Sequence, residues 1–76
     1  MAKEKSAFDR VQFVMMDNEI DIYKLADKLL VGDPLMVNFE SFDDIESNKI
    51  LSFLSGVTYS IDGEIEQIQE KIFLFS

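Results

Sequence analysis

Residues 34–75 read PLMVNFESFDDIESNKILSFLSGVTYSIDGEIEQIQEKIFLF, and their apolar side chains recur at the spacings typical of strands and helices. The apolar pattern is interrupted at Asn38, at Gly56 and at the pair Asp62-Gly63. The segment contains no motif that brings a nucleophile, a general base or metal ligands together. It therefore predicts a domain built on apolar packing. It also predicts that the protein binds a partner and is not an enzyme.

Two strands belong to the first half of the chain. Leu35 to Phe39 is almost continuously apolar, as in a strand that is covered on both faces. Upstream, Arg10 to Met16 reads RVQFVMM, in which Val11, Phe13 and Met15 alternate with other side chains in the manner of a strand. Because a helix is expected between them, the two strands are predicted to pair in parallel through a crossover.

The helix between these strands has a start signal and a stop signal. Asn18 is a candidate N-cap that accepts a hydrogen bond from the backbone N–H of Asp21. The sequence Val31-Gly32-Asp33-Pro34 is expected to end the helix, because Gly favours a C-terminal turn and Pro favours extended backbone before it. The apolar residues on one face of this helix are Ile22, Leu25, Ala26 and Leu29.

A second helix is expected to begin at Asp43 or Asp44 and to extend to about Ser60, since Asp caps helix N-termini. Beyond it Asp62-Gly63 turns the chain, and two short strands up to Phe75 predict an antiparallel hairpin with its turn at Gln69-Glu70. The predicted core face of the second helix consists of Ile50, Phe53, Leu54, Val57 and Ile61.

The expected element order is β-α-β-α-β-β. This order predicts an α/β fold, a compact two-layer α/β sandwich with both helices on one face of the sheet. Residues 1–9 are expected to be a flexible polar lead, and residues 10–76 are expected to form the single domain that a 76-residue chain can hold.

Composition excludes several functions. The chain has no Cys and no His, so disulfides, thiolate nucleophiles, imidazole bases and the usual zinc ligands are absent. Seven basic and fifteen acidic side chains give a net charge of −8, which disfavours binding to nucleic acid. No apolar run approaches the about 20 residues that cross a bilayer, and the first residues are too polar for a secretory signal.

Two pairs of carboxylates could suggest a metal or acid–base site. Asp43-Asp44 is better explained as a helix start, and Glu64 and Glu66 as two outward positions on one face of a strand. We therefore predict no catalytic residue, no metal and no cofactor. A small dimeric ligand-sensing regulatory domain stays open as an alternative, with an amino acid as a possible ligand, since a phosphate site would need a Gly-rich turn.

Small residues recur every four positions on the second helix. Ser52, Gly56 and Ser60 form a row that lets another backbone approach closely, and its neighbour is either the sheet of the same domain or a second copy of the helix. Phe73 and Phe75 also favour dimerisation, because the aromatic side chains of the last strand are not all expected to point into one monomer. We expect a homodimer, and further polymerisation stays open.

Taken in order, these residues resemble the core domain of SepF, a cell-division protein of many bacteria and archaea. The resemblance rests on V-N-F at 37–39, the pair Asp43-Asp44, F-L-S-G-V-T-Y-S-I-D-G-E-I at 53–65 and K-I-F-L-F at 71–75. It covers nearly the whole body of the chain. It implies a dimeric adaptor that binds the C-terminal tail peptide of the tubulin-like division protein FtsZ.

The resemblance also implies which residues meet that peptide. In family members two basic residues and an acidic one often precede the Phe of the second helix; here Asn48, Lys49 and Ser52 stand before Phe53, so one positive charge remains. Phe53 would help to form a groove for apolar side chains, Lys49 would meet a carboxylate and Asn48 a peptide group. Core packing of Phe53 and simple solvation of Lys49 are the alternatives.

Members of the family reach the membrane through an amphipathic N-terminal helix and a flexible linker. Met1 to Asp9 offers only Phe8 for the apolar face of such a helix, so the anchor is expected to lie outside this sequence. The expected location of the full-length protein is cytoplasmic, at the division site on the inner face of the cell membrane.

Overall fold

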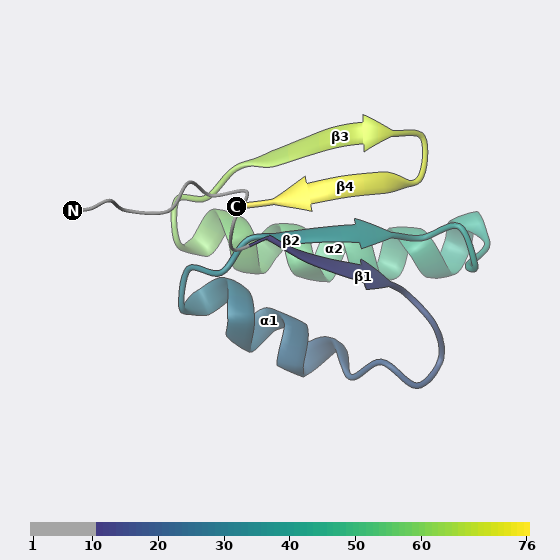
Figure 1. The fold of residues 1–76 in the computed structure, drawn as a ribbon, viewed down its shortest axis with the longest axis horizontal. Helices are drawn as coiled ribbons and strands as arrows, with labels where there is room; N and C mark the ends of the chain where they lie inside the picture. Colours follow the sequence, from purple (N-terminus) through teal and green to yellow (C-terminus); the bar gives the residue numbers. More distant parts are fainter. Residues whose placement is uncertain (1–10) are drawn as a thin grey trace.

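The computed structural model describes residues 11–76, and it confirms the predicted element order (Figure 1). The elements are β1 (Gln12–Met15), α1 (Ile22–Leu30), β2 (Leu35–Asn38), α2 (Asp44–Ser60), β3 (Ile65–Gln69) and β4 (Ile72–Phe75).

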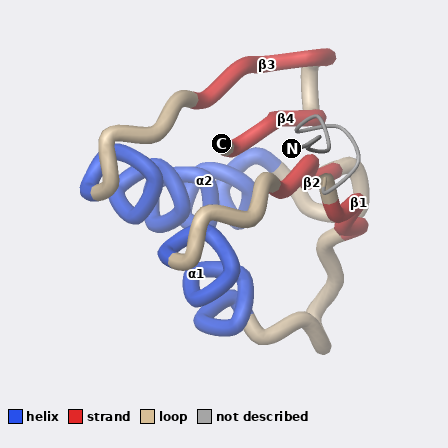
Figure 2. Tube along the Cα trace, turned by 60° about the vertical axis from the view of Figure 1, so that its left-hand side comes forward, coloured by secondary structure: helices blue, strands red, loops and turns tan. Residues whose placement is uncertain are grey.

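The strands form one four-stranded sheet in the order β1-β2-β4-β3. β1 and β2 are parallel, as predicted, and β4 is antiparallel to both β2 and β3. Figure 2 shows both helices on the same side of the sheet. The predicted two-layer α/β arrangement is therefore confirmed, and the sheet has one covered face and one face without a helix.

Alternate strand residues build the core on the covered face. In the β2–β4 pair Leu35 lies opposite Phe75 and Val37 opposite Phe73, and Leu35, Val37 and Phe75 are fully buried. Phe73 is half-buried and meets Phe39 edge to face, with ring centroids 6.0 Å apart. The helices close this core with Leu25, Leu29 and Leu54.

The first helix begins three residues later than the predicted cap implies. Asp21, not Asn18, is the N-cap, and its Oδ1 accepts from the backbone N–H of Tyr23 at 2.9 Å. The predicted cap was wrong because Asp17 starts a separate turn: its Oδ1 accepts from the N–H of Glu19, and its carbonyl accepts from Ile20. The predicted apolar face is confirmed, with Leu25, Ala26 and Leu29 buried and Ile22 packed against the core.

The second helix confirms the predicted start and end. Asp43 is its N-cap and accepts from the N–H of Glu46 at 2.8 Å. Leu54 is fully buried, while Ile50, Phe53 and Val57 are partly buried against the core. Ile61 was placed in the core wrongly. It is the C-cap residue of the helix and stays 38% exposed, because the chain leaves the helix there.

Both helices end in the same hydrogen-bonded turn, with different residues. After α1, the N–H of Gly32 donates to Leu29 and that of Asp33 to Lys28, and Gly32 has a φ of 94°. After α2, Asp62 donates to Tyr59 and Gly63 to Thr58, and here Asp62 carries the positive φ of 60°.

Gly63 is required for another reason. A Cβ at this position would lie 2.7 Å from Thr58 Cγ2 and 2.9 Å from the carbonyl oxygen of Ser76. The glycine therefore lets the start of the hairpin pack directly on the last turn of α2 and on the end of the described chain.

Several strand boundaries differ from the predictions. β1 and β2 are shorter than predicted, and Arg10, the predicted first residue of the first strand, lies outside the described residues. The hairpin turn falls at Glu70-Lys71 rather than at Gln69-Glu70, because a register shift between Gln67 and Gln69 keeps Gln69 in β3. Lys71 then fixes this turn to α2: its Nζ donates to the carbonyl of Phe42 at 2.7 Å and lies 3.6 Å from Asp44.

Candidate functional site

The face of the sheet away from the helices, here called the open face, is apolar. Phe13 neighbours Met36 in the β1–β2 register, and Met36 lies opposite Leu74 of β4. Phe13 is 73% exposed and Met15 is 53% exposed. The prediction that the second strand is covered on both faces is wrong, because Met36 and Asn38 are only half-buried on this side. On β1, β2 and β4 the open face consists of Phe13, Met15, Met36, Asn38, Ile72 and Leu74, and at its β3 edge Glu66 lies opposite Leu74.

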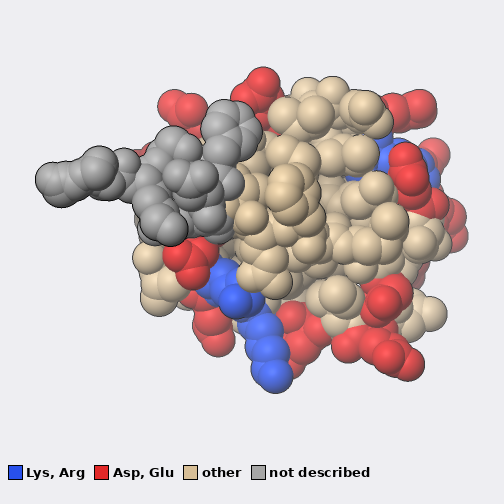
Figure 3. Space-filling model, in the orientation of Figure 1, with Lys and Arg blue, Asp and Glu red and all other residues tan. Residues whose placement is uncertain are grey.

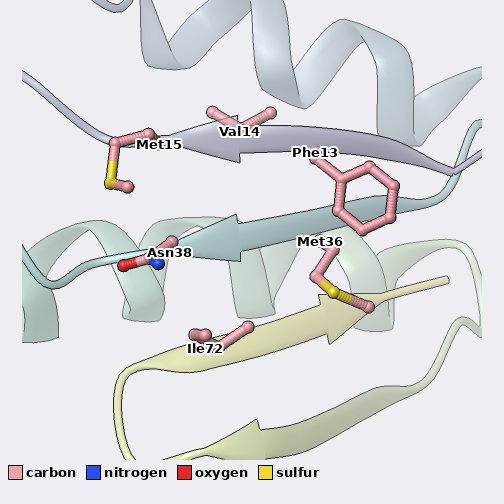
Figure 4. Close-up of a pocket in the computed structure, with 6 residues that line it drawn as sticks. All are labelled: Phe13, Val14, Met15, Met36, Asn38 and Ile72. Carbon is pink, nitrogen blue, oxygen red and sulfur yellow. The ribbon is translucent and has the colours of Figure 1, made fainter.

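A shallow hollow of about 260 Å³ lies on the open face. Figure 4 shows its side chains, which come from three neighbouring strands. Asn38 supplies the polar side chain of the lining, and its Oδ1 already accepts from the backbone N–H of Glu40 at 2.7 Å. The hollow thus offers apolar contact rather than a set of converging polar groups. Its lining consists of Phe13, Val14, Met15, Met36, Asn38 and Ile72.

The charges lie around this surface rather than on it. In Figure 1 the strands lie in front of α2, so the space-filling view of Figure 3, in the same orientation, shows the open face. Its middle is uncharged, and acidic side chains lie along much of its margin, together with basic side chains at the lower and right-hand parts of the view. An apolar surface with an excess of acidic side chains around it favours a ligand that combines apolar and basic groups.

The residues predicted to meet a partner peptide lie elsewhere, on α2. Asn48, Lys49 and Ser52 are exposed, and Phe53 is half-buried; we call these four residues the helix strip. The ring of Phe53 meets Tyr23 of α1 edge to face, with centroids 5.6 Å apart. Their spacing of one and four residues brings the four side chains to one side of the helix. The hollow on the open face lies on the opposite side of the sheet from this strip.

The structure bears on the two simpler alternatives for the helix strip, which are core packing of Phe53 and solvation of Lys49. Phe53 packs against the core with part of its ring and remains partly exposed, so it contributes to folding whatever else it does. Lys49 Nζ lies 3.8 Å from Glu46 Oε2, with both side chains more than half exposed. An exposed pair of this kind contributes little to stability, so Lys49 remains available to a partner.

The small-residue row on α2 faces away from the sheet. Ser52, Gly56 and Ser60 are all exposed, and no atom would lie within 4 Å of a Cβ added at Gly56. The alternative that this row packs against the sheet of its own domain is therefore wrong.

Phe73 and Phe75 do not need a second copy to cover them. Phe75 is fully buried and Phe73 is half-buried, and both point toward the helices. The expectation that these side chains cannot all be accommodated in one monomer was wrong, because their alternation places both on the covered face. The large apolar strand residues that remain exposed are Phe13, Met15 and Ile68, and the sequence analysis selected none of them as an interface residue.

Two further properties concern the described part of the chain. Residues 11–76 hold no cluster of three or more carboxylate, His or Cys side chains suited to a metal ion. Among the same residues, neither helix is long and apolar enough to cross a membrane.

The fold and these surfaces define a small α/β domain with an exposed apolar sheet face. Residues 12–76 match the family model of the cell division protein SepF. The chain belongs to the SepF family.

Curated relatives carry the same description, "Cell division protein SepF". The protein from Carboxydothermus hydrogenoformans is 34% identical over all of this chain and 47% of its own length. The protein from Lactiplantibacillus plantarum is 39% identical over 71% of this chain and 39% of its own length. This chain therefore spans less than half the length of the relatives that it matches.

Proposed function

We propose that this chain is a cell-division adaptor that binds the C-terminal tail of FtsZ. The observation that carries the proposal is the match of residues 12–76 to the SepF family. The exposed apolar surfaces of the domain support it, since docking of a peptide needs apolar area that the monomer leaves uncovered.

The helix strip is the proposed contact for the tail peptide. Its exposed Lys49 would attract a carboxylate of the peptide, and the open part of the Phe53 ring would receive an apolar side chain. Asn48 and Ser52 are exposed beside them and supply polar groups for the peptide backbone. In the whole protein, a segment beyond this chain would hold the assembly at the division site on the inner face of the cell membrane.

Self-association is proposed through α2. The exposed row of Ser52, Gly56 and Ser60 would let the same helix of a second copy approach closely. Gly56→Lys tests this cleanly, because a side chain at this position meets nothing in the monomer. We expect the variant to remain folded and to lose the dimer in light scattering. A variant with the mass of the parent protein in solution would contradict the proposed row.

Isothermal titration with a synthetic peptide that copies the FtsZ tail of the same organism tests the peptide site. We expect saturable binding, weakened at least about fivefold by Phe53→Ala, in line with the loss of a buried aromatic contact. Tyr59→Ala is the matched control, because Tyr59 is an aromatic residue on the same helix and is 62% exposed. Circular dichroism establishes that both variants are folded. Absence of binding by the parent protein, or equal loss in both variants, would reject the helix strip.

The alternative is a small ligand-sensing domain, for which the hollow on the open face is the available cavity. Its volume of about 260 Å³ lies below the about 300–1,000 Å³ that is usual for ligand pockets. Its polar side chain, Asn38, already accepts a backbone hydrogen bond. The geometry therefore favours a macromolecular partner over a small ligand.

A further inference from the structure

The two edges of the sheet differ in how they are protected. Exposed edge strands can pair with other chains, and proteins usually prevent this with charges, Pro or bulges. β3, at one edge, carries Glu66 and an irregular register between Gln67 and Gln69. β1, at the other edge, reads QFVM and has neither a charge nor a Pro, and its register with β2 is continuous.

The hydrogen bonds of β1 show which backbone groups face outward. The N–H of Gln12 donates to the carbonyl of Pro34 at 3.1 Å, and that of Met16 donates to Asn38 at 2.9 Å. In a parallel ladder, alternate residues point their backbone groups to the same side. Gln12, Val14 and Met16 therefore pair inward with β2, and Phe13 and Met15 direct their N–H and C=O groups to the outer edge.

The same two residues place their side chains on the open face. Phe13 and Met15 line the hollow together with Met36 and Ile72 (Figure 4). A strand added along β1 would extend the sheet, and every second side chain of that strand would lie next to Phe13 or Met15. The edge thus offers backbone hydrogen bonds and apolar contact to the same ligand.

We propose that the outer edge of β1 is a docking site for an extended segment of a partner protein, in which apolar residues alternate with basic ones. The apolar residues would cover Phe13 and Met15, and the backbone would add a strand to the sheet. The site is separate from the helix strip and goes beyond the proposed function.

The basic character of the partner follows from charge. The chain has a net charge of −8. Exposed Asp17 and Glu19 follow β1, and exposed Glu40 follows the end of its parallel neighbour β2, so carboxylates gather near one end of this edge. A second copy of the chain would bring the same negative charge to this edge, whereas a basic segment is attracted to it.

A capped nine-residue peptide of alternating valine and lysine is a suitable probe, with binding followed by isothermal titration. The control peptide has the same sequence with N-methyl groups on alternate backbone amides, which removes the donors for strand addition. We expect saturable binding of the first peptide and at least about tenfold weaker binding of the second, as for the loss of two hydrogen bonds. A peptide with glutamate in place of lysine is expected not to bind. Equal binding of the parent and N-methylated peptides would overturn the proposal.

Phe13→Lys and Ile68→Lys form a matched pair of variants. Both side chains are exposed, at 73% and 42%, they lie on opposite edge strands, and each substitution changes the net charge equally. Phe13→Lys is expected to abolish binding of the valine–lysine peptide, and Ile68→Lys to leave it unchanged; equal loss in both would overturn the proposal. A dimer of the parent protein that forms with rising concentration and that Phe13→Lys dissociates would also overturn the proposal, since a second copy would then occupy the edge. Binding of the FtsZ tail peptide to Phe13→Lys reports on the helix strip separately.

Discussion

The two faces of the sheet are built from the same strands and differ in how far their side chains are buried. On the covered face Leu35, Val37 and Phe75 are fully buried beneath the helices. On the open face Phe13 and Met15, one residue away from the covered positions, are mostly exposed although they are equally apolar. Two helices cover one side of a four-stranded sheet, so strand alternation supplies more apolar area than the monomer buries. The covered face stabilises the domain, whereas the open face remains uncovered in the monomer.

The largest effect is expected on the covered face. Leu54 is fully buried where α2 meets the sheet. Leu54→Ala should lower the free energy of unfolding by about 2–5 kcal/mol, through lost apolar contact and the cavity that remains. Urea denaturation measures this change. A loss below about 1 kcal/mol would show that the core is looser than its burial indicates.

Gly63 tests how tightly the hairpin is held to the covering helix. Gly63→Ala should lower the free energy of unfolding by about 1–3 kcal/mol, because the added methyl group would lie 2.7 Å from Thr58 Cγ2 and 2.9 Å from two carbonyl oxygens. Gly56→Ala is the matched control in the same helix region. Its added methyl group would have no atom within 4 Å, and the substitution should stabilise the helix by up to about 1 kcal/mol. Similar denaturation curves for the two variants would contradict the close packing at Gly63.

Asp62 is the residue with positive φ in the turn after α2, where the corresponding turn after α1 has Gly32. Asp62→Gly should raise the free energy of unfolding by about 0.5 kcal/mol, because glycine adopts this conformation without steric cost, offset in part by its greater freedom in the unfolded chain. A change of the opposite sign would show that the side chain of Asp62 stabilises the turn.

The smallest effect on stability is expected on the open face. Phe13→Thr keeps a residue with high strand propensity and removes an aromatic side chain that is 73% exposed. The free energy of unfolding should change by no more than about 0.5 kcal/mol. A loss comparable with that of Leu54→Ala would mean that Phe13 is covered in solution, and it would remove the distinction between the two faces.

Much of the fold could be predicted because local signals and packing agree. Asp43 before an apolar helical pattern, Gly32-Asp33-Pro34 after another, and the alternation in residues 71–75 each point to the element that the structure contains. The errors arose where two local signals compete. Asn18 and Asp21 are both good caps, and the turn at Asp17 decides between them through its own hydrogen bonds.

The candidate site was less predictable for a different reason. Alternation in the first strand divides Phe13 and Met15 from Val14 and Met16, but it does not say which set the helices cover. In the structure Val14 and Met16 are buried and Phe13 and Met15 are exposed. The row at Ser52, Gly56 and Ser60 is ambiguous in the same way, because small side chains allow close packing against either the sheet of the same domain or a second copy of the helix.

The central claim is that the outer side of β1 is open in the free protein. Amide hydrogen exchange followed by NMR tests it residue by residue at Phe13, Val14, Met15 and Met16. The account predicts rapid exchange at Phe13 and Met15, whose N–H groups face outward, and slow exchange at Val14 and Met16, whose N–H groups pair with β2. Equal, slow exchange at all four residues in the free protein would contradict it, because another chain would then already occupy this edge.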